Sequence, residues 1–259
     1  MRVTILGCGT STGVPVIGCP CDVCGSGDPR NQRTRSSIAV AQNGFSILVD
    51  TAPDLRFQAL AVGLTRVDAA LFTHDHADHI FGLDELRTFN FVMGRPIPIY
   101  GSQRVIERIK TVFSYIWDPD APKGGGLPMI GLNVIEGPLE LGGITVEPLP
   151  LKHGETTILG FMFNRLLAYM TDVSEIPDET LEKVRGVPLA IVDALRYRPH
   201  VTHFSVDAAV KAVESIKPGR ALLTHMSHSL DYQRLRADLP PGVEPAYDGM
   251  AIELEEKKQ

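Results

Sequence analysis

A run of histidines and aspartates constrains this chain more than any other feature. The segment Thr73-His74-Asp75-His76-Ala77-Asp78-His79 holds three histidines and two aspartates within six consecutive positions. Histidine makes up only 8 of the 259 residues, so a chance cluster in a solvated turn is improbable. His74 and His76 can meet one ion from an extended segment, while Asp78 and His79, at the turn into a helix, can face a second ion. The run therefore predicts half of a two-metal site.

Three further candidate ligands lie at the ends of predicted strands, where a rigid element delivers a side chain to the edge of a sheet. They are His153, Asp172 and His225, which follow the apolar runs 146–151, 166–170 and 221–223. Each alone is an ordinary strand-end residue, but together with the run at 74–79 they complete the ligand sets of two ions. Neutral imidazoles and carboxylates suit zinc, manganese or iron(II).

Short apolar runs alternate with stretches of helical period, which predicts an α/β fold. The predicted strands are 3–6, 37–41, 46–49, 69–72, 97–100, 144–151, 159–163, 166–170, 189–192 and 221–223. The predicted helices are 53–62, 84–91, 103–113, 177–183, 205–216 and 230–239. Residues 117–150 are rich in glycine and proline and predict loops and antiparallel strands. Two sheets flanked by helices therefore fit better than a strictly alternating barrel.

Three of the four cysteines cluster in one loop. Cys19, Cys21 and Cys24 fall within six positions, and glycines at the edges of the loop allow a tight path. His228, three residues after the candidate ligand His225, is the best fourth ligand, and the set would form a closed structural zinc site. A disulfide between Cys21 and Cys24, or free thiols, are the alternatives. Four cysteines are too few for a disulfide scaffold in a chain of this length, which favours zinc.

The run Thr-His-x-His-x-Asp-His, with a later histidine, aspartate and histidine at strand ends, resembles the metallo-β-lactamase fold superfamily over essentially the whole chain. The resemblance implies an αββα sandwich of two mixed sheets flanked by helices. It also divides the ligands between two manganese or zinc ions: one on His74, His76 and His153, a second on Asp78, His79 and His225, with Asp172 as the bridge between them.

The cysteine loop makes the chain similar to PhnP-type phosphodiesterases of the carbon-phosphorus lyase pathway. In that group an N-terminal cysteine loop binds zinc with a histidine three residues after an active-site histidine. The matching stretches are 13–15, 18–24, 73–79, 148–153, 223–228 and 247–250. The resemblance implies a single hydrolase domain over residues 1–259, with a cysteine zinc loop near 18–26. It does not fix the substrate, because the fold hosts several hydrolytic chemistries.

Hydrolysis of a phosphodiester needs a proton for the leaving alkoxide, and histidine is the usual donor. His200 and His203 are the candidates. PhnP-type proteins carry their acid histidine just before the helix predicted at 205–216, which favours His203, so His203 and Asp172 are the expected catalytic residues. Asp50 and Asp248 resemble superfamily aspartates that orient metal-bound histidines through the far ring nitrogen.

Composition limits the partners that this chain can take. A net charge of −6 and a pI near 5.7 argue against a broad basic face, so we expect no stable complex with nucleic acid. No apolar run is long enough to span a bilayer, and the first residues lack the apolar region of a secretory signal. We therefore expect a cytoplasmic protein with no membrane partner, and a second copy of the chain is a candidate partner. Three arginines, at 30, 33 and 35, are interpreted as a solvated loop surface.

These observations predict an enzyme, a dinuclear metal-dependent phosphodiesterase. It would hydrolyse a small phosphodiester, with a ribosyl cyclic phosphate as the suggested substrate, by a metal-bound hydroxide. The alternative is a carboxylic-ester, thioester or lactone hydrolase of the same fold, because the same hydroxide would serve. A tRNA-processing endonuclease is disfavoured, since it needs a basic face and an extended arm. A complete ligand set for two ions also argues against a non-enzymatic metal scaffold.

Overall fold

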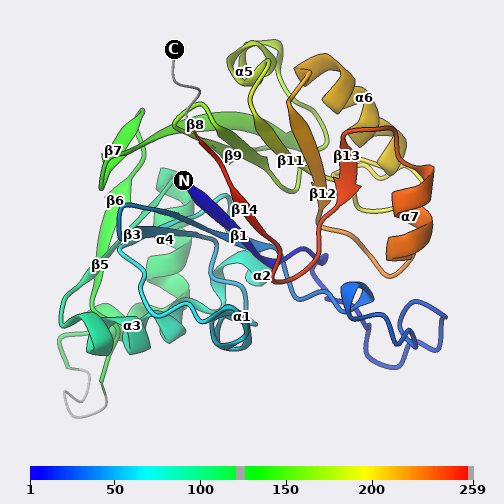
Figure 1. The fold of residues 1–259 in the computed structure, drawn as a ribbon. Coiled ribbons are helices and arrows are strands. Elements are labelled where there is room, and N and C mark those ends of the chain that lie inside the picture. Colours follow the sequence, from blue (N-terminus) through cyan, green and yellow to red (C-terminus); the bar gives the residue numbers. More distant parts are fainter. Residues whose placement is uncertain (121–125, 256–259) are drawn as a thin grey trace.

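Two mixed sheets of seven strands each form the centre of the computed structural model, which describes residues 1–120 and 126–255 (Figure 1). In spatial order, the first sheet comprises β14 (Ala251–Glu253), β1 (Arg2–Gly7), β2 (Ser37–Gln42), β3 (Phe45–Val49), β4 (Ala69–Leu71), β5 (Ile97–Gly101) and β6 (Ile130–Val134). The second comprises β13 (Val243–Pro245), β12 (Arg220–Thr224), β11 (Leu189–Asp193), β10 (Leu167–Met170), β9 (Thr156–Phe163), β8 (Ile144–His153) and β7 (Leu139–Leu141).

Helices flank the two sheets. They are α1 (Leu55–Val62), α2 (Ala77–Ile80), α3 (Leu86–Met93), α4 (Gln103–Val112), α5 (Asp178–Val184), α6 (Val206–Ile216) and α7 (Tyr232–Asp238), with short 3-10 turns at Pro29–Asn31, Leu83–Glu85 and Ser114–Trp117. Figure 1 shows α1, α3 and α4 beside the first sheet and α5 and α6 beside the second. The predicted αββα sandwich is therefore confirmed. Among the described residues, none of the helices has the length and apolar character needed to cross a bilayer.

The main core lies between the sheets and continues beneath α5, α6 and α7, and a second core lies between the first sheet and its helices. Strand β3 contributes to both, because successive side chains of a strand point to opposite faces. Ile47 and Val49 are fully buried in the core shared with the second sheet, whereas Leu48 is fully buried in the core under α1, α3 and α4. Both faces of this strand are covered, which explains the apolar run at residues 47–49.

Both sheets change from antiparallel to parallel pairing partway across. Strands β14, β1, β2 and β3 pair antiparallel, whereas β3, β4, β5 and β6 pair parallel. The second sheet repeats this pattern from β7 to β10 and from β10 to β13. Parallel strands end at the same edge of a sheet, so the loops that follow β3, β4, β10, β11 and β12 can form one site.

Three residues that closely follow these strands adopt a left-handed backbone. The φ angles are 63° at Asp50, 58° at Asp172 and 57° at His225. Such a conformation costs roughly 1–3 kcal/mol in a residue other than glycine and persists only where the surrounding structure enforces it. It turns the chain sharply at the end of the strand, so that the side chain stays at the sheet edge.

The predicted strands and helices are present, with ends shifted by up to three residues. The expectation of antiparallel strands within residues 117–150 holds for β7 and β8 but is wrong for β6, which pairs parallel with β5. The chain passes through α4 between these two strands, and such a crossover returns the chain in the same direction. Residues 121–125 of this stretch lie outside the described residues.

Candidate active site and cysteine cluster

The predicted active-site ligands meet where the strands of the two sheets end. The first sheet supplies the ligands from 74 to 79, and the second supplies the later three. They form two groups, in each of which one donor atom per residue lies within 4.8 Å of the others: His74, His76 and His153 in one, and Asp78, His79, Asp172 and His225 in the other. Asp172 Oδ1 is 3.9 Å from His74 Nε2, and Asp172 Oδ2 is 3.3 Å from His79 Nε2. The two oxygens of Asp172 therefore face different groups, as a bridging carboxylate requires.

Two buried ring nitrogens indicate that this cluster fits metal ions. Within the described residues, Nε2 of His74 and Nε2 of His79 have no hydrogen-bond partner, although an unpaired buried polar atom is costly. His79 Nε2 lies 3.3 Å from carboxylate oxygens of Asp78 and Asp172, but without the alignment of a hydrogen bond. Divalent ions would satisfy these nitrogens and neutralise the carboxylates together.

The far ring nitrogens of two ligand histidines, His79 and His153, are held by the protein. Nδ1 of His79 is 2.7 Å from Asp50 Oδ2, and the Asp50 carboxylate also accepts hydrogen bonds from the backbone and side chain of Thr73. His153 Nδ1 donates to the carbonyl oxygen of Asp172 at 2.7 Å. These contacts fix the rings so that Nε2 faces the cluster. Asp50 thus lies where an orienting carboxylate is expected.

The structure corrects the expectation for Asp248. Its carboxylate accepts hydrogen bonds from the backbone N–H of Cys8 at 3.0 Å and from the backbone and hydroxyl of Thr34 at 2.7 and 2.6 Å. None of its hydrogen bonds within residues 1–120 and 126–255 reaches a histidine. Asp248 instead joins the end of β1 to the segment before β2, because its loop passes beside that segment rather than beside the metal ligands.

His203 lies at the edge of the cluster and His200 lies outside it. The His203 ring centroid is 4.8 Å from those of both His153 and His225. Its Nδ1 shares a hydrogen bond of 2.9 Å with Oδ2 of Asp193, so Nε2 is the nitrogen left to meet a ligand. His200 is exposed and contacts the side chain of Thr202. The geometry therefore favours His203 over His200 as a proton donor.

Sequence reasoning missed the buried partner of His203. Asp193 is fully buried at the end of β11, and one of its oxygens has no partner among the described residues. A carboxylate at the end of an apolar strand was the available signal, since Asp50 and Asp172 occupy the same kind of position. Thr10 and Ser36 were also missed, and their hydroxyls lie 3.3 Å from Nε2 and Nδ1 of His225 respectively.

In the absence of an ion, neighbouring carboxylates determine which of the buried histidines are protonated. Burial disfavours the imidazolium form and holds the pKa of His74 well below its usual value. For His79, burial is outweighed by the carboxylates of Asp172 and two further aspartates, which raise its pKa well above the usual value. Asp172 also raises the pKa of His225 against the effect of burial. An incoming ion must displace protons from His79 and His225.

We therefore expect metal binding to release protons and to strengthen as the pH rises. The pKa values of His79 and His225 lie above the ordinary 6.5, so protons still compete with the metal above that pH. Each displaced proton should change the apparent affinity by about tenfold per pH unit below the pKa that it reflects. Calorimetric titration with Mn²⁺ in buffers of different ionisation enthalpy counts these protons, and an apparent enthalpy independent of the buffer would contradict the expectation.

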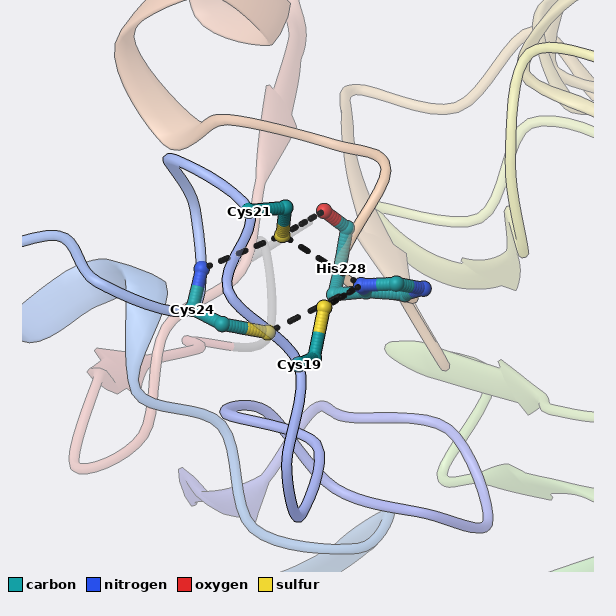
Figure 2. A group of neighbouring side chains, drawn as sticks. All are labelled: Cys19, Cys21, Cys24 and His228. Carbon is teal, nitrogen blue, oxygen red and sulfur yellow. Dashed lines mark hydrogen bonds between the residues drawn. The ribbon is translucent and has the colours of Figure 1, made fainter.

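The three cysteines of the N-terminal loop surround His228 (Figure 2). His228 Nδ1 lies 3.2, 3.4 and 3.7 Å from the Sγ atoms of Cys19, Cys21 and Cys24. A tetrahedral zinc ion, with Zn–S near 2.3 Å and Zn–N near 2.0 Å, separates nitrogen and sulfur ligands by about 3.5 Å. The cluster therefore fits a zinc ion. All four cysteines are free thiols in the structure, so the alternative disulfide is not formed.

Hydrogen bonds to Cys21 favour the thiolate form, which binds cations. The backbone N–H of Cys24 contributes most, and together with His228 it lowers the pKa of Cys21 to about 6. Thiolate is the form of cysteine that binds metal, and a thiol with this pKa is largely ionised at neutral pH.

The chain is similar to a known domain family, to curated proteins and to a solved structure. The model of the beta-lactamase superfamily domain matches residues 46–226. An octanoyltransferase of Porphyromonas gingivalis is 36% identical over 99% of this chain, which spans only 52% of that relative. A ribonuclease Z of Pyrobaculum neutrophilum is 27% identical, covering 85% of this chain and 90% of the relative. The crystal structure of a diphosphatase from the PhnP family superposes with a TM-score of 0.91 at 40% identity, covering 98% of both chains.

Proposed function

This chain belongs to the beta-lactamase superfamily and has its hydrolase fold, and on that premise we propose that it is a dinuclear metal-dependent phosphodiesterase acting on small substrates. The observation that carries the proposal is the position of Asp172, with one oxygen toward each group of ligands. The names of the diphosphatase and of the ribonuclease Z both refer to cleavage at phosphate, which supports a phosphate ester as substrate. The chain covers about half of the octanoyltransferase, so that activity is not carried over.

Two divalent ions held by these ligands would activate a water molecule and polarise the phosphoryl oxygens. The residues of this chain hold the ligands and supply the proton. Asp50 fixes the ring of His79, and the carbonyl of Asp172 fixes the ring of His153. His203 Nε2 would donate its proton to the leaving alkoxide, which is too basic to depart easily as an anion.

Asp193, the buried partner of His203, supports this proton donation. Burial, aided by the neighbouring His225, lowers the pKa of His203 to about 4, whereas burial raises the pKa of Asp193 well above its usual value. The pair therefore holds one proton between Asp193 Oδ2 and His203 Nδ1 in addition to the proton on Nε2. When Nε2 gives its proton to the leaving group, the proton of Asp193 can move to Nδ1, so that His203 remains neutral.

A net charge of −6 favours a small substrate over a polynucleotide. We also propose that residues 1–259 act as one domain, which includes the zinc loop near 18–26. A ribosyl cyclic phosphate is the first candidate substrate. A diphosphate-linked compound is a second candidate, favoured by the 40% identical diphosphatase.

The proposal is tested by turnover of protein reconstituted with Mn²⁺ or Zn²⁺. The substrates are an aryl phosphodiester, a 2',3'-cyclic nucleotide and a diphosphate-linked dinucleotide, each with a chelated control. We expect hydrolysis of at least one of them, abolished by the chelator. Activity retained after verified metal removal would refute the mechanism. No turnover of these three, combined with hydrolysis of a lactone, thioester or carboxylic ester, would replace the proposal with the alternative chemistry.

Replacing His203 by alanine should affect substrates according to their leaving groups. For the cyclic nucleotide, whose leaving group is a basic alkoxide, we expect kcat to fall by about 10²–10⁴, the usual contribution of a general acid. The aryl and diphosphate substrates release weakly basic anions, so kcat for these substrates should fall much less. His200→Ala is the matched control, because the exposed His200 ring lies 5.2 Å from that of His203 and should be dispensable. An equal loss for all substrates would remove His203 from the acid role.

A further inference from the structure

One short segment contributes a side chain to each of the two metal clusters. His225 belongs to the active-site group and His228 to the cysteine cluster, with only two residues between them. The backbone between them is held on two sides. Met226 N–H donates to Cys8 O at 2.9 Å, and Ser227 N–H donates to Leu195 O at 2.9 Å. A shift of this segment, residues 225–230, would therefore move ligands of both clusters.

A buried arginine fixes the carbonyl groups of the same segment. The guanidinium of Arg33 donates to Ser227 O at 3.0 Å and to Leu230 O at 2.6 Å, and also to Asn31 Oδ1 and Arg30 O. Arg33 is 1% exposed, which corrects the interpretation of this position as a solvated loop surface. The four contacts are to neutral oxygens, and burial lowers the pKa of Arg33. A buried cation is costly unless its N–H groups are hydrogen-bonded. The hydrogen bonds of Arg33 meet this need and hold residues 227–230 in place.

The strand-like segment that carries Arg33 also contacts the base of the cysteine loop through its backbone and the active-site cluster through a side chain. Arg33 and Val14 exchange two backbone hydrogen bonds of 2.7 and 2.8 Å, just before the cysteine loop begins. Three residues after Arg33, the hydroxyl of Ser36 lies 3.3 Å from Nδ1 of His225. The base of the cysteine loop, the segment 225–230 and the active-site histidine are thus connected through one arginine and its neighbours.

We propose that Arg33 is a positioning residue that couples the two metal clusters, so that an ion in the cysteine cluster strengthens binding of the ion held by His225. The inference rests on the proposed function only in taking His225 and His228 as metal ligands. Binding of an ion at the cysteine cluster immobilises His228. Because Arg33 binds the carbonyls of residues 227 and 230, this restraint extends along residues 227–230 and holds His225 in its left-handed conformation. Coupling between two binding sites is reciprocal, so active-site ions must strengthen zinc binding by the same factor.

The first experiment uses the unmodified protein. Mn²⁺ prefers oxygen and imidazole ligands to thiolates, so its binding, followed by electron paramagnetic resonance, reports on the active site. We expect removal of zinc from the cysteine cluster to weaken Mn²⁺ binding by about tenfold, within the usual range of coupling between sites. The reciprocal readout replaces the zinc by Co²⁺, whose thiolate absorption reports on the cysteine cluster, with and without Mn²⁺. Equal Mn²⁺ affinity with and without zinc would overturn the proposal.

A double-mutant cycle tests the part of Arg33. In the parent protein Cys21→Ser should weaken Mn²⁺ binding about tenfold, whereas in an Arg33→Met background the same change should have little further effect. Arg33→Lys keeps the charge but cannot reach all the carbonyls, and it serves if the methionine variant does not fold. Arg35→Met is the matched control, since Arg35 pairs with Asp54 and donates to no residue from 225 to 230 among its described hydrogen bonds.

The outcomes separate this proposal from the proposed function. A Cys21→Ser effect of the same size with and without Arg33 would remove Arg33 from the coupling. Coupled Mn²⁺ binding in a protein inert to every phosphodiester would leave the coupling standing and refute the function. Phosphodiester turnover with uncoupled binding would do the reverse.

Discussion

Replacing Asp172 by asparagine should remove both active-site ions at once and lower kcat/KM for a phosphodiester at least a thousandfold. A loss of that size corresponds to about 4 kcal/mol of transition-state stabilisation. The reason is the position of the carboxylate, fully buried with one oxygen toward each group of ligands. Without its negative charge, two cations would repel one another across the cluster, and the affinity of both would fall. Metal content after dialysis, measured by mass spectrometry, and steady-state kinetics check the result.

Asp50→Asn is the matched control for this experiment. Asp50 is also a buried aspartate after a strand, but among the described residues His79 is the one candidate ligand that it contacts. Loss of such an orienting carboxylate costs about 10–100-fold in metal affinity or activity, so the control should weaken one ion rather than both. An Asp172→Asn protein that keeps two ions after dialysis would remove Asp172 from the bridge.

Replacing Cys21 by serine should eliminate one zinc ion per chain and lower the melting temperature by roughly 6–12 °C. Structural zinc contributes to folding directly, and a loss of about 3 kcal/mol shifts the melting temperature of a protein of this size by that amount. At saturating metal the active-site ions should still bind. Zinc content and differential scanning calorimetry provide the two measurements.

Cys8→Ala is the control for the cysteine cluster. Cys8 is buried beside Asp248, outside the cluster, and burial raises the pKa of its thiol well above the usual value. This variant should keep the full zinc content. If Cys21→Ser also kept its zinc, the cysteine loop would not be a zinc site.

The sequence was sufficient to predict which ligands meet because their positions follow local rules. Residues 74–79 are adjacent in the chain, and Asp172 and His225 lie within two residues of the ends of apolar strands that share an edge. The division into strands and helices followed from the same apolar patterns. Strand β6 was harder, because the direction of its pairing depends on the crossover through α4 rather than on its own residues.

The contacts that could not be predicted join segments distant in the chain. Arg33 looked like a solvated residue, because the carbonyls that bind it belong to residues 227 and 230. Asp248 was expected beside a histidine but caps the backbone of Cys8 and Thr34. In each case the composition of the local segment says nothing about which remote backbone or side chain lies beside it.

The division of ligands between the two sheets has a consequence for the time at which the protein can acquire its ions during synthesis. The ligands from 74 to 79 leave the ribosome early, whereas Asp172 and His225 follow only after most of the second sheet has been made. The nascent first half therefore offers imidazoles without the bridging carboxylate. Tight loading of the two proposed ions must therefore wait until strand β12 has been translated and has joined its sheet, so that metal uptake follows the folding of the second sheet.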